Sequence, residues 1–128
     1  MKKLVIAAVL CLILVLSTSC VASTTWQTIT AEQAHAIMAE TYDFVLLDVR
    51  TQAEFRQARI DGAQLLPYDE INSRAGELPG HDAIILIYCR SGRRSAIAAQ
   101  VLAELGFTNI HDFGGINDWP FDIIEGEN

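Results

Sequence analysis

A cysteine followed by arginines and a glycine is the part of this sequence best suited to chemistry. Cys89 ends an apolar run, and the next six residues, all expected to contact a substrate, are Arg90, Ser91, Gly92, Arg93, Arg94 and Ser95. A turn that enters a helix directs backbone N–H groups at one point, where an anion or a thiolate can bind. This helix N-terminus and the three arginines should lower the pKa of the thiol, and the thiolate is the nucleophilic form. The pattern therefore predicts a cysteine nucleophile in an anion-binding loop.

The main alternative for Cys89 is an inert cysteine buried at the end of a core strand. Free cysteine is among the most frequently buried residue types. Arginines, however, are almost never buried without partners, and three of them follow Cys89 closely. The composition of the loop therefore favours the reactive cysteine.

The beginning of the chain has the pattern of an export signal. Lys2 and Lys3 precede an apolar run over 4–16, which is too short to span a membrane comfortably. Small residues then lead to Cys20, which resembles the lipidated cysteine of bacterial lipoproteins, although Ser17 stands where those usually have leucine. Cleavage after Ala22 is the alternative. We expect a signal over 1–20, a linker over 21–26 and a folded domain over 27–124, exported to the periplasm or cell envelope.

Export would leave one free thiol and an acidic domain. Cys11 would leave with the signal and Cys20 would be lipidated, as a membrane tether, or removed, so Cys89 would have no disulfide partner. Loss of Lys2 and Lys3 removes two positive charges, so the formal net charge changes from −7 to −9. An acidic domain of this kind is a poor partner for nucleic acid. An anionic substrate would have to be attracted locally, by the arginines of the loop.

Strand and helix patterns alternate along the rest of the chain, which predicts an α/β domain with a mainly parallel sheet. Thr30 with Gln33, and Thr51 with Glu54, have the spacing of capping boxes at helix starts. The expected strands cover 26–29, 44–49, 63–66, 83–88 and 109–113. The expected helices cover 31–40, 52–57 and 95–105, with a helical turn over 69–75.

Four motifs, in this order and spacing, resemble the rhodanese-like sulfurtransferase domain over about 26–120. They are Leu47-Asp48-Val49-Arg50 with Glu54-Phe55, Ile60-Asp61-Gly62-Ala63, the segment from Tyr88 to Ser95, and Gly114-Gly115-Ile116 with Trp119. The resemblance implies a five-stranded parallel sheet with helices on both faces and the cysteine loop at the carboxyl end of the central strand, where ligands bind on such sheets. This chain has Ala58-Arg59 where the family commonly has Gly-His. It resembles the small single-domain members.

The resemblance also implies a reaction. Cys89 would take the sulfane sulfur of thiosulfate or a similar donor as a persulfide, and would pass it to cyanide or a thiol. Gly92 leaves room for the added sulfur, and guanidinium groups suit the oxyanions of the donor. Arg94 would close the loop, whereas Arg90 and Arg93 would lie at its mouth. Neither a cofactor nor nucleic acid is implied, and the oligomeric state is left open.

The acidic and aromatic residues of the motifs are expected to support the site. Asp48 should accept hydrogen bonds from backbone donors beside the loop, and Arg50 should pair with Glu54. Trp119 should be a core aromatic side chain. The histidines, at a polar helix face, after a turn and in a strand, share no metal-ligand spacing, which speaks against a metal site. They are His35, His81 and His111.

Two other functions compete with sulfur transfer. Cysteine phosphatases and arsenate reductases place their anion-binding arginine six positions after the cysteine, whereas here that position is Ser95 and Arg94 comes one residue earlier. A shorter loop makes a smaller cradle, which suits one sulfur better than a phosphate. Rhodanese-like domains that lack the cysteine serve as binding or regulatory modules, but this chain keeps Cys89.

Overall fold

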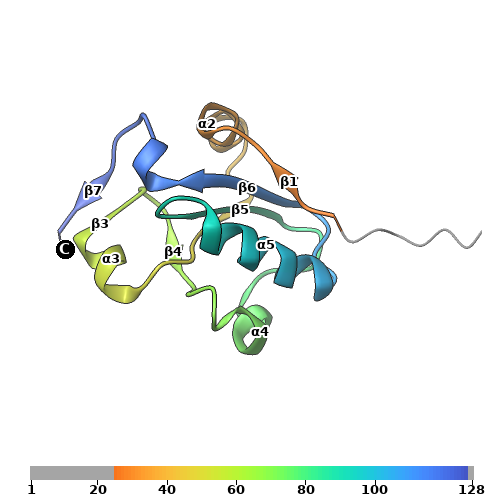
Figure 1. Cartoon of the computed structure of the whole chain (residues 1–128). Coiled ribbons are helices and arrows are strands. Elements are labelled where there is room, and N and C mark those ends of the chain that lie inside the picture. The colour runs from red at the N-terminus through yellow and green to blue at the C-terminus, as the bar shows by residue number, and fades with distance from the viewer. Residues whose placement is uncertain (1–24, 127–128) are drawn as a thin grey trace, which may run out of the picture.

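Five parallel strands form the central sheet of the computed structural model, which describes residues 25–126 (Figure 1). Their order across the sheet is β1-β6-β5-β2-β4, with β5 in the middle. The five strands are β1 (Gln27–Thr28), β2 (Phe44–Asp48), β4 (Gln64–Leu65), β5 (Ile84–Cys89) and β6 (Ile110–Gly115). The predicted five-stranded parallel sheet is confirmed. The predicted signal over 1–20, with Cys11 and Cys20, lies outside the described residues.

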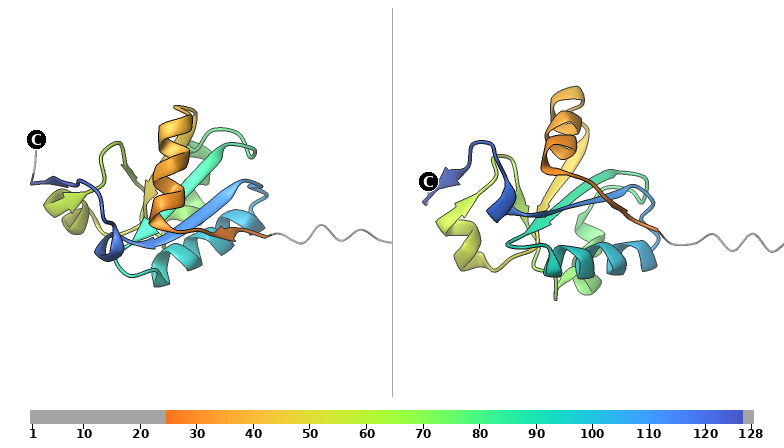
Figure 2. Two further views of the ribbon diagram at one scale, coloured as in Figure 1. Left: turned by 90° about the horizontal axis from the view of Figure 1, so that it is seen from above. Right: turned by 45° about the horizontal axis from the view of Figure 1, so that its top comes forward.

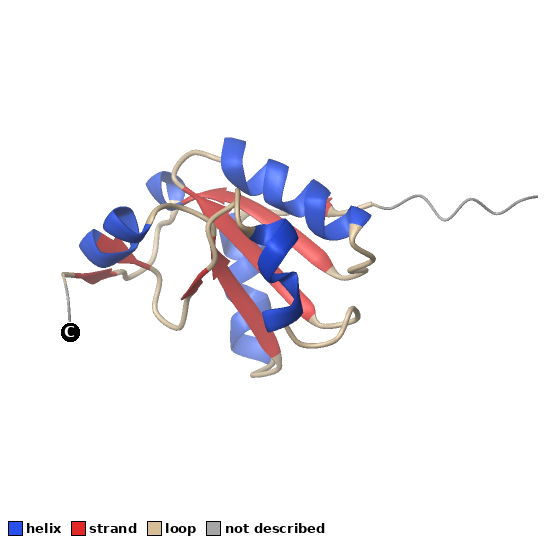
Figure 3. Ribbon diagram, turned by 90° about the horizontal axis from the view of Figure 1, so that it is seen from below, coloured by secondary structure: helices blue, strands red, loops and turns tan. Residues whose placement is uncertain are grey.

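Helices cover both faces of this sheet, as predicted. Helix α2 (Ala31–Glu40) lies on one face, and α4 (Ile71–Arg74) and α5 (Arg93–Glu104) lie on the other (Figures 2 and 3). The remaining helical segments are α3 (Gln52–Gln57), η1 (Ala75–Glu77) and η2 (Ile116–Asp118). None of the helices within residues 25–126 is long and apolar enough to cross a membrane.

The alternation of side chains along β5 decides which way the cysteine points. Ile85, Ile87 and Cys89 belong to the hydrophobic core that includes Leu102 of α5. Their neighbours Leu86 and Tyr88 belong to the core under α2. Successive strand residues face opposite sides, so a strand covered on both faces is apolar throughout. Cys89 therefore faces α5, the helix that follows it in the chain.

Local sequence signals set the bounds of two helices. In both predicted capping boxes the threonine hydroxyl accepts a backbone N–H three residues on, and the side chain there accepts the backbone N–H of the threonine. Helices α2 and α3 begin and end where the sequence predicts. Helix α5 begins at Arg93, two residues earlier than expected, after Gly92 with φ of 108°. Glycine adopts this left-handed backbone without strain, so the chain turns sharply from the strand into the helix.

A small antiparallel pair at the carboxyl end of the sheet was not predicted. Strand β3 (Ala58–Arg59) pairs with β7 (Ile124–Glu125), and the Arg59 side chain donates to the carbonyl of Gly126 at 3.1 Å. Strands of two residues have no periodicity to detect, and this pair joins distant parts of the chain. Strand β7 runs one residue past the domain boundary expected at 124.

The hydroxyl of Tyr88 links the central strand to the segment that follows β3. It accepts the backbone N–H of Ile60 at 3.2 Å, and both residues are buried. Replacing Tyr88→Phe should lower the free energy of unfolding by about 1–2 kcal/mol, because that N–H loses its partner inside the protein. Urea denaturation measures the change. Tyr42→Phe is the matched control, since Tyr42 is fully exposed; an equal effect of the two changes would contradict the prediction.

Candidate active site

Hydrogen-bond donors from the loop surround the sulfur of Cys89. The Gly92 N–H donates to Cys89 Sγ at 3.0 Å, and the Sγ lies 3.6 Å from Ser95 Oγ. Cys89 is only 1% exposed and Ser95 is fully buried. The loop and the start of α5 therefore enclose the sulfur with hydrogen-bonding groups.

These donors determine the ionisation of the thiol. Burial by itself raises the pKa of Cys89, but the Ser95 hydroxyl and the backbone N–H groups of Ser95, Gly92 and Ser91 lower it by more. The net result is a lowered pKa, in the direction that the sequence predicts. The physical cause differs from the expectation, because hydrogen bonds from the loop have the largest lowering effects and not the charges of the arginines.

Strand β6 supports the loop from below. Gly115 lies opposite Cys89 in the register of β5 and β6. A Cβ atom at Gly115 would lie 2.7 Å from Ser91 Cα and would clash with the carbonyl of Arg90. The Arg90 carbonyl also accepts the backbone N–H of Asn117 at 3.2 Å. Gly115, to which no role was assigned from the sequence, is thus required for the close approach of strand and loop.

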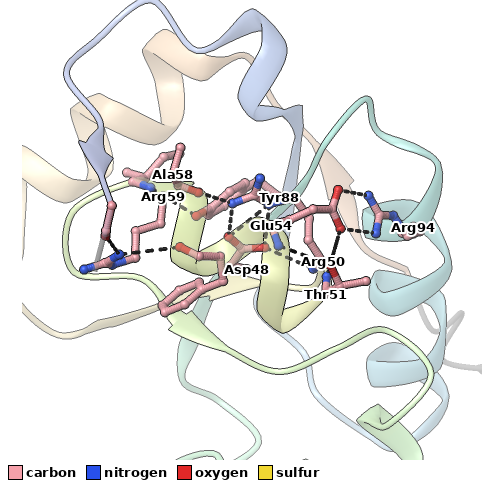
Figure 4. Close-up of polar contacts among 11 residues, drawn as sticks. Asp48, Arg50, Thr51, Glu54, Ala58, Arg59, Tyr88 and Arg94 are labelled. Carbon is pink, nitrogen blue, oxygen red and sulfur yellow. Dashed lines mark hydrogen bonds and ion pairs between the residues drawn. The ribbon is translucent and has the colours of Figure 1, made fainter. Parts of the chain in front are cut away.

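The three arginines of the loop have different surroundings. Arg94 makes two hydrogen bonds of 2.8 Å to the carboxylate of Glu54, which ties the start of α5 to α3 (Figure 4). Arg90 and Arg93 are exposed, and the Arg93 guanidinium lies 5.9 Å from the ring centre of Tyr68. Arg94 thus binds α3 and does not close the loop with its side chain, and the contact of each arginine with a substrate stays a prediction. No sequence pattern indicated a role for Tyr68.

The predicted pairing of Arg50 with Glu54 is wrong. Arg50 binds Asp48 instead, with Nη2 at 2.7 Å from Oδ2 and Nε at 2.9 Å from Oδ1, and it also donates to the carbonyl of Ala58 (Figure 4). Burial lowers the pKa of Arg50, but Asp48 raises it by more. Residues two apart at a strand end share a face. Glu54 faces Arg94 from α3, so its carboxylate is already engaged.

Asp48 accepts one backbone hydrogen bond, from the N–H of Arg50 at 3.0 Å. Its carboxylate also binds the Arg50 side chain, and Tyr88 is a further hydrogen-bond partner, so these contacts stabilise the end of β2 and do not involve the cysteine loop. The expected support from Asp48 is thus indirect. It orders the segment through which β2 leads into α3.

The aromatic residues near the C-terminal end form a separate cluster. Trp119 packs on Phe113 with 5.4 Å between ring centres, as expected of a core aromatic residue. It also lines a groove of about 490 Å³ beside α2. His35 is exposed on α2, and its ring stacks on Phe121 at 3.9 Å between ring centres. Within residues 25–126 no three His, Cys, Asp or Glu side chains group as metal ligands.

A parallel α/β sheet with a cysteine loop at the carboxyl end of its central strand is the architecture of a sulfur-transfer domain of the rhodanese type. The family described as Rhodanese-like domain matches residues 30–120. The chain belongs to this family, and it is similar to the small single-domain sulfurtransferases within it.

Two curated relatives and one solved structure illustrate the similarity. Thiosulfate sulfurtransferase PspE of Escherichia coli is 31% identical over 62% of this chain and 78% of its own. A sulfurtransferase of Allochromatium vinosum is 39% identical over 71% of this chain and 85% of its own. The structure titled "rhodanese with anions from E. coli" superposes with a TM-score of 0.59 at 30% identity, over 64% of this chain and 98% of that one.

The Glu54–Arg94 pair should make stability depend on pH. The hydrogen bonds from Arg94 lower the pKa of Glu54 to about 2, burial opposes them, and Thr51 adds to the lowering. Because the pKa is lower in the folded state, the stabilisation is complete above the ordinary value of 4.5 and is lost as the pH falls towards 2. Glu54→Gln should cost roughly 1–3 kcal/mol at pH 7 and much less near pH 2.5.

Denaturant titrations of wild type and Glu54→Gln at several pH values measure this difference. Glu40→Gln on the exposed surface of α2 is the control for loss of one carboxylate. A stability difference between wild type and Glu54→Gln that stays constant from pH 7 to pH 2.5 would contradict the prediction.

Proposed function

We propose that the protein is a thiosulfate sulfurtransferase that carries one sulfur atom as a persulfide on Cys89. The observation that carries this proposal is the sulfur of Cys89, which accepts the Gly92 N–H and has a lowered pKa inside a closed loop. The thiolate is the form that attacks sulfur. A family relative named as a thiosulfate sulfurtransferase supports the choice of donor.

The proposed reaction has two displacement steps. The Cys89 thiolate attacks the outer sulfur of thiosulfate, the S–S bond of the donor breaks, and sulfite leaves with the electron pair of that bond. An acceptor thiolate or cyanide then attacks the outer sulfur of the persulfide. The S–S bond to Cys89 breaks, and the thiolate is regenerated. No electrons or protons are left over in either step.

The loop suits a single sulfur better than a tetrahedral oxyanion. Arg94 comes five positions after Cys89 and is held by Glu54, so its guanidinium is engaged outside the loop. Backbone N–H groups, together with the Ser95 hydroxyl, remain to stabilise an anionic sulfur. A phosphatase would need an arginine whose guanidinium donates hydrogen bonds to the phosphate oxygens of its substrate. This contrast argues against phosphate or arsenate as the substrate.

The donor would be attracted by the exposed arginines at the mouth. Thiosulfate is a dianion, whereas the chain has a formal net charge of −7. Arg90 and Arg93 are exposed next to the cysteine, and planar guanidinium groups match oxyanions. A relative whose structure is titled with anions supports an anion site in this family.

We also propose, from the sequence alone, that the protein is exported to the cell envelope. The segment 1–20 has the pattern of an export signal, and Cys20 is its candidate lipid attachment site. The sulfur donor and acceptor would then be those available outside the cytoplasm.

Formation of the persulfide is the direct test of the proposed function. The purified full-length protein is incubated with thiosulfate, freed of reagent and digested, and its peptides are weighed. We expect one additional sulfur on the peptide that contains Cys89, and its loss as thiocyanate when cyanide is added. Cys89→Ser should show neither, whereas Cys20→Ser should behave as wild type. Wild-type protein that gains no sulfur from thiosulfate or polysulfide would be a binding module and not an enzyme.

Substitution of the mouth arginines tests how the donor is captured. Arg90→Gln or Arg93→Gln should raise the KM for thiosulfate about two- to fivefold, as expected for an exposed charge pair, and should weaken its dependence on salt. The KM for a neutral sulfane donor should change little. Arg74→Gln is the control, because it removes the same charge from α4, outside the loop. Equal effects of all three changes would show that net charge and not local capture matters.

A further inference from the structure

A buried carboxylate lies next to the cysteine loop and has no part in the reaction described above. Asp112 is on β6, three residues before Gly115, and it is only 4% exposed. Burial raises the pKa of Asp112 above its ordinary value, although hydrogen bonds from the Gly114 N–H and the Ser95 hydroxyl oppose this effect. A buried charged group costs free energy unless hydrogen bonds compensate it, so its presence beside the loop needs a reason.

Three contacts lead from Asp112 to the sulfur. Asp112 Oδ1 accepts the backbone N–H of Gly114 at 2.9 Å. The carbonyl oxygen of Gly114 accepts the Ser95 hydroxyl at 3.3 Å. Ser95 Oγ in turn lies 3.6 Å from Cys89 Sγ. Gly114 has φ of 88°, a left-handed backbone conformation that glycine adopts without strain, and its N–H and carbonyl each make one of these contacts.

We propose that Asp112 is a positioning residue for Cys89, which fixes the Gly114 peptide so that its carbonyl holds the Ser95 hydroxyl beside the sulfur. The proposal rests on the use of Cys89 as the nucleophile. Asp112 does not touch the substrate or the sulfur in this role, and Ser95 transmits its effect.

The position of Ser95 Oγ matters because its hydrogen bond must reverse. While Cys89 is a thiol, its S–H donates to Ser95 Oγ, and the single hydroxyl proton of Ser95 is shared between the carbonyl oxygens of Gly92 at 3.0 Å and Gly114 at 3.3 Å. When the thiol loses its proton, the hydroxyl must turn to donate to the thiolate. The two carbonyl oxygens keep Oγ in place before that rotation, so the donor is in position when the charge appears.

The bond that Asp112 makes requires an acceptor and not a charge. The carbonyl oxygen of an asparagine accepts the same N–H with almost the same shape, whereas alanine leaves the Gly114 N–H unpaired. Asp112→Asn should therefore preserve the reactivity of Cys89, and Asp112→Ala should reduce it. A role that depended on the negative charge would give the opposite result for asparagine.

The other charged or titratable groups around the loop stay the same in these variants. They are Tyr88 on β5, Arg90 in the loop, Asp48 and Arg50 at the end of β2, Glu54 on α3, Arg93 and Arg94 on α5, and His111 on β6. Any change in the pH dependence of Cys89 among the variants therefore comes from Asp112 or Ser95.

Alkylation of Cys89 by iodoacetamide measures its thiolate without any sulfur donor. Full-length wild type, Asp112→Ala, Asp112→Asn, Ser95→Ala and the Ser95→Ala/Asp112→Ala double variant are compared across pH, with the modified Cys89 peptide quantified by mass so that Cys11 and Cys20 do not contribute. We expect alkylation about three- to tenfold slower at pH 7 in both alanine variants, as for one lost hydrogen bond, with the inflection at higher pH. Asp112→Asn should stay within about twofold of wild type.

The double variant separates positioning from general destabilisation. If Asp112 acts through Ser95, Asp112→Ala should have almost no further effect when Ser95 is already alanine. The same fold-loss in both backgrounds, or wild-type alkylation in a folded Asp112→Ala, would overturn the proposal. If Asp112→Ala does not fold, Asp112→Asn decides, because slowing equal to that of Ser95→Ala would overturn it. The result does not depend on sulfur transfer, so a failure of the proposed function would be seen separately, in the persulfide experiment.

Discussion

The structure depends on the requirement that a buried sulfur be stable as an anion. Cys89 is almost fully enclosed, and burial alone would raise the pKa of its thiol. Hydrogen bonds from the loop and Ser95 reverse that effect, and they exist only because the chain turns at once from β5 into α5. Gly92 provides the turn, and Gly115 lets β6 pass directly beneath it. The two glycines therefore permit the backbone geometry that places hydrogen-bond donors around the sulfur of Cys89.

Most charged residues near the loop stabilise the strand ends and helices that position Cys89, and they do not contact the sulfur. The buried pair of Asp48 and Arg50 orders the end of β2, and the pair of Glu54 and Arg94 ties α3 to α5. Each pair joins one carboxylate to one guanidinium. Arg90 and Arg93 are exposed beside the cysteine, and they are the groups that we propose to attract an anionic donor. On this proposal, an acidic protein presents a local site for an anion.

The features predicted correctly from the sequence are those that depend on residues close together in the chain. Capping boxes and a glycine-induced turn depend on residues three or four apart, so α2 and α3 were predicted with their observed bounds. The partner of each arginine depends on distances between elements, which is why Arg50 was paired with the wrong carboxylate. The β3–β7 pair was missed because its strands have only two residues each, which is too short for a periodic pattern, and lie far apart in the sequence. Asp112 was missed because its contacts with Gly114 and the cysteine loop are formed only in the folded protein, and no sequence pattern indicates them.

A crystal structure of the protein after reaction with thiosulfate tests the central claim most directly. The account predicts an additional sulfur bonded to Cys89 Sγ inside the loop and within hydrogen-bond distance of its backbone N–H groups. Arg94 should still be bound to Glu54, since the loop has no need to rearrange around one atom. A loop that opens so that Arg94 leaves Glu54 to bind the oxygens of a tetrahedral anion, with Cys89 unmodified, would contradict it.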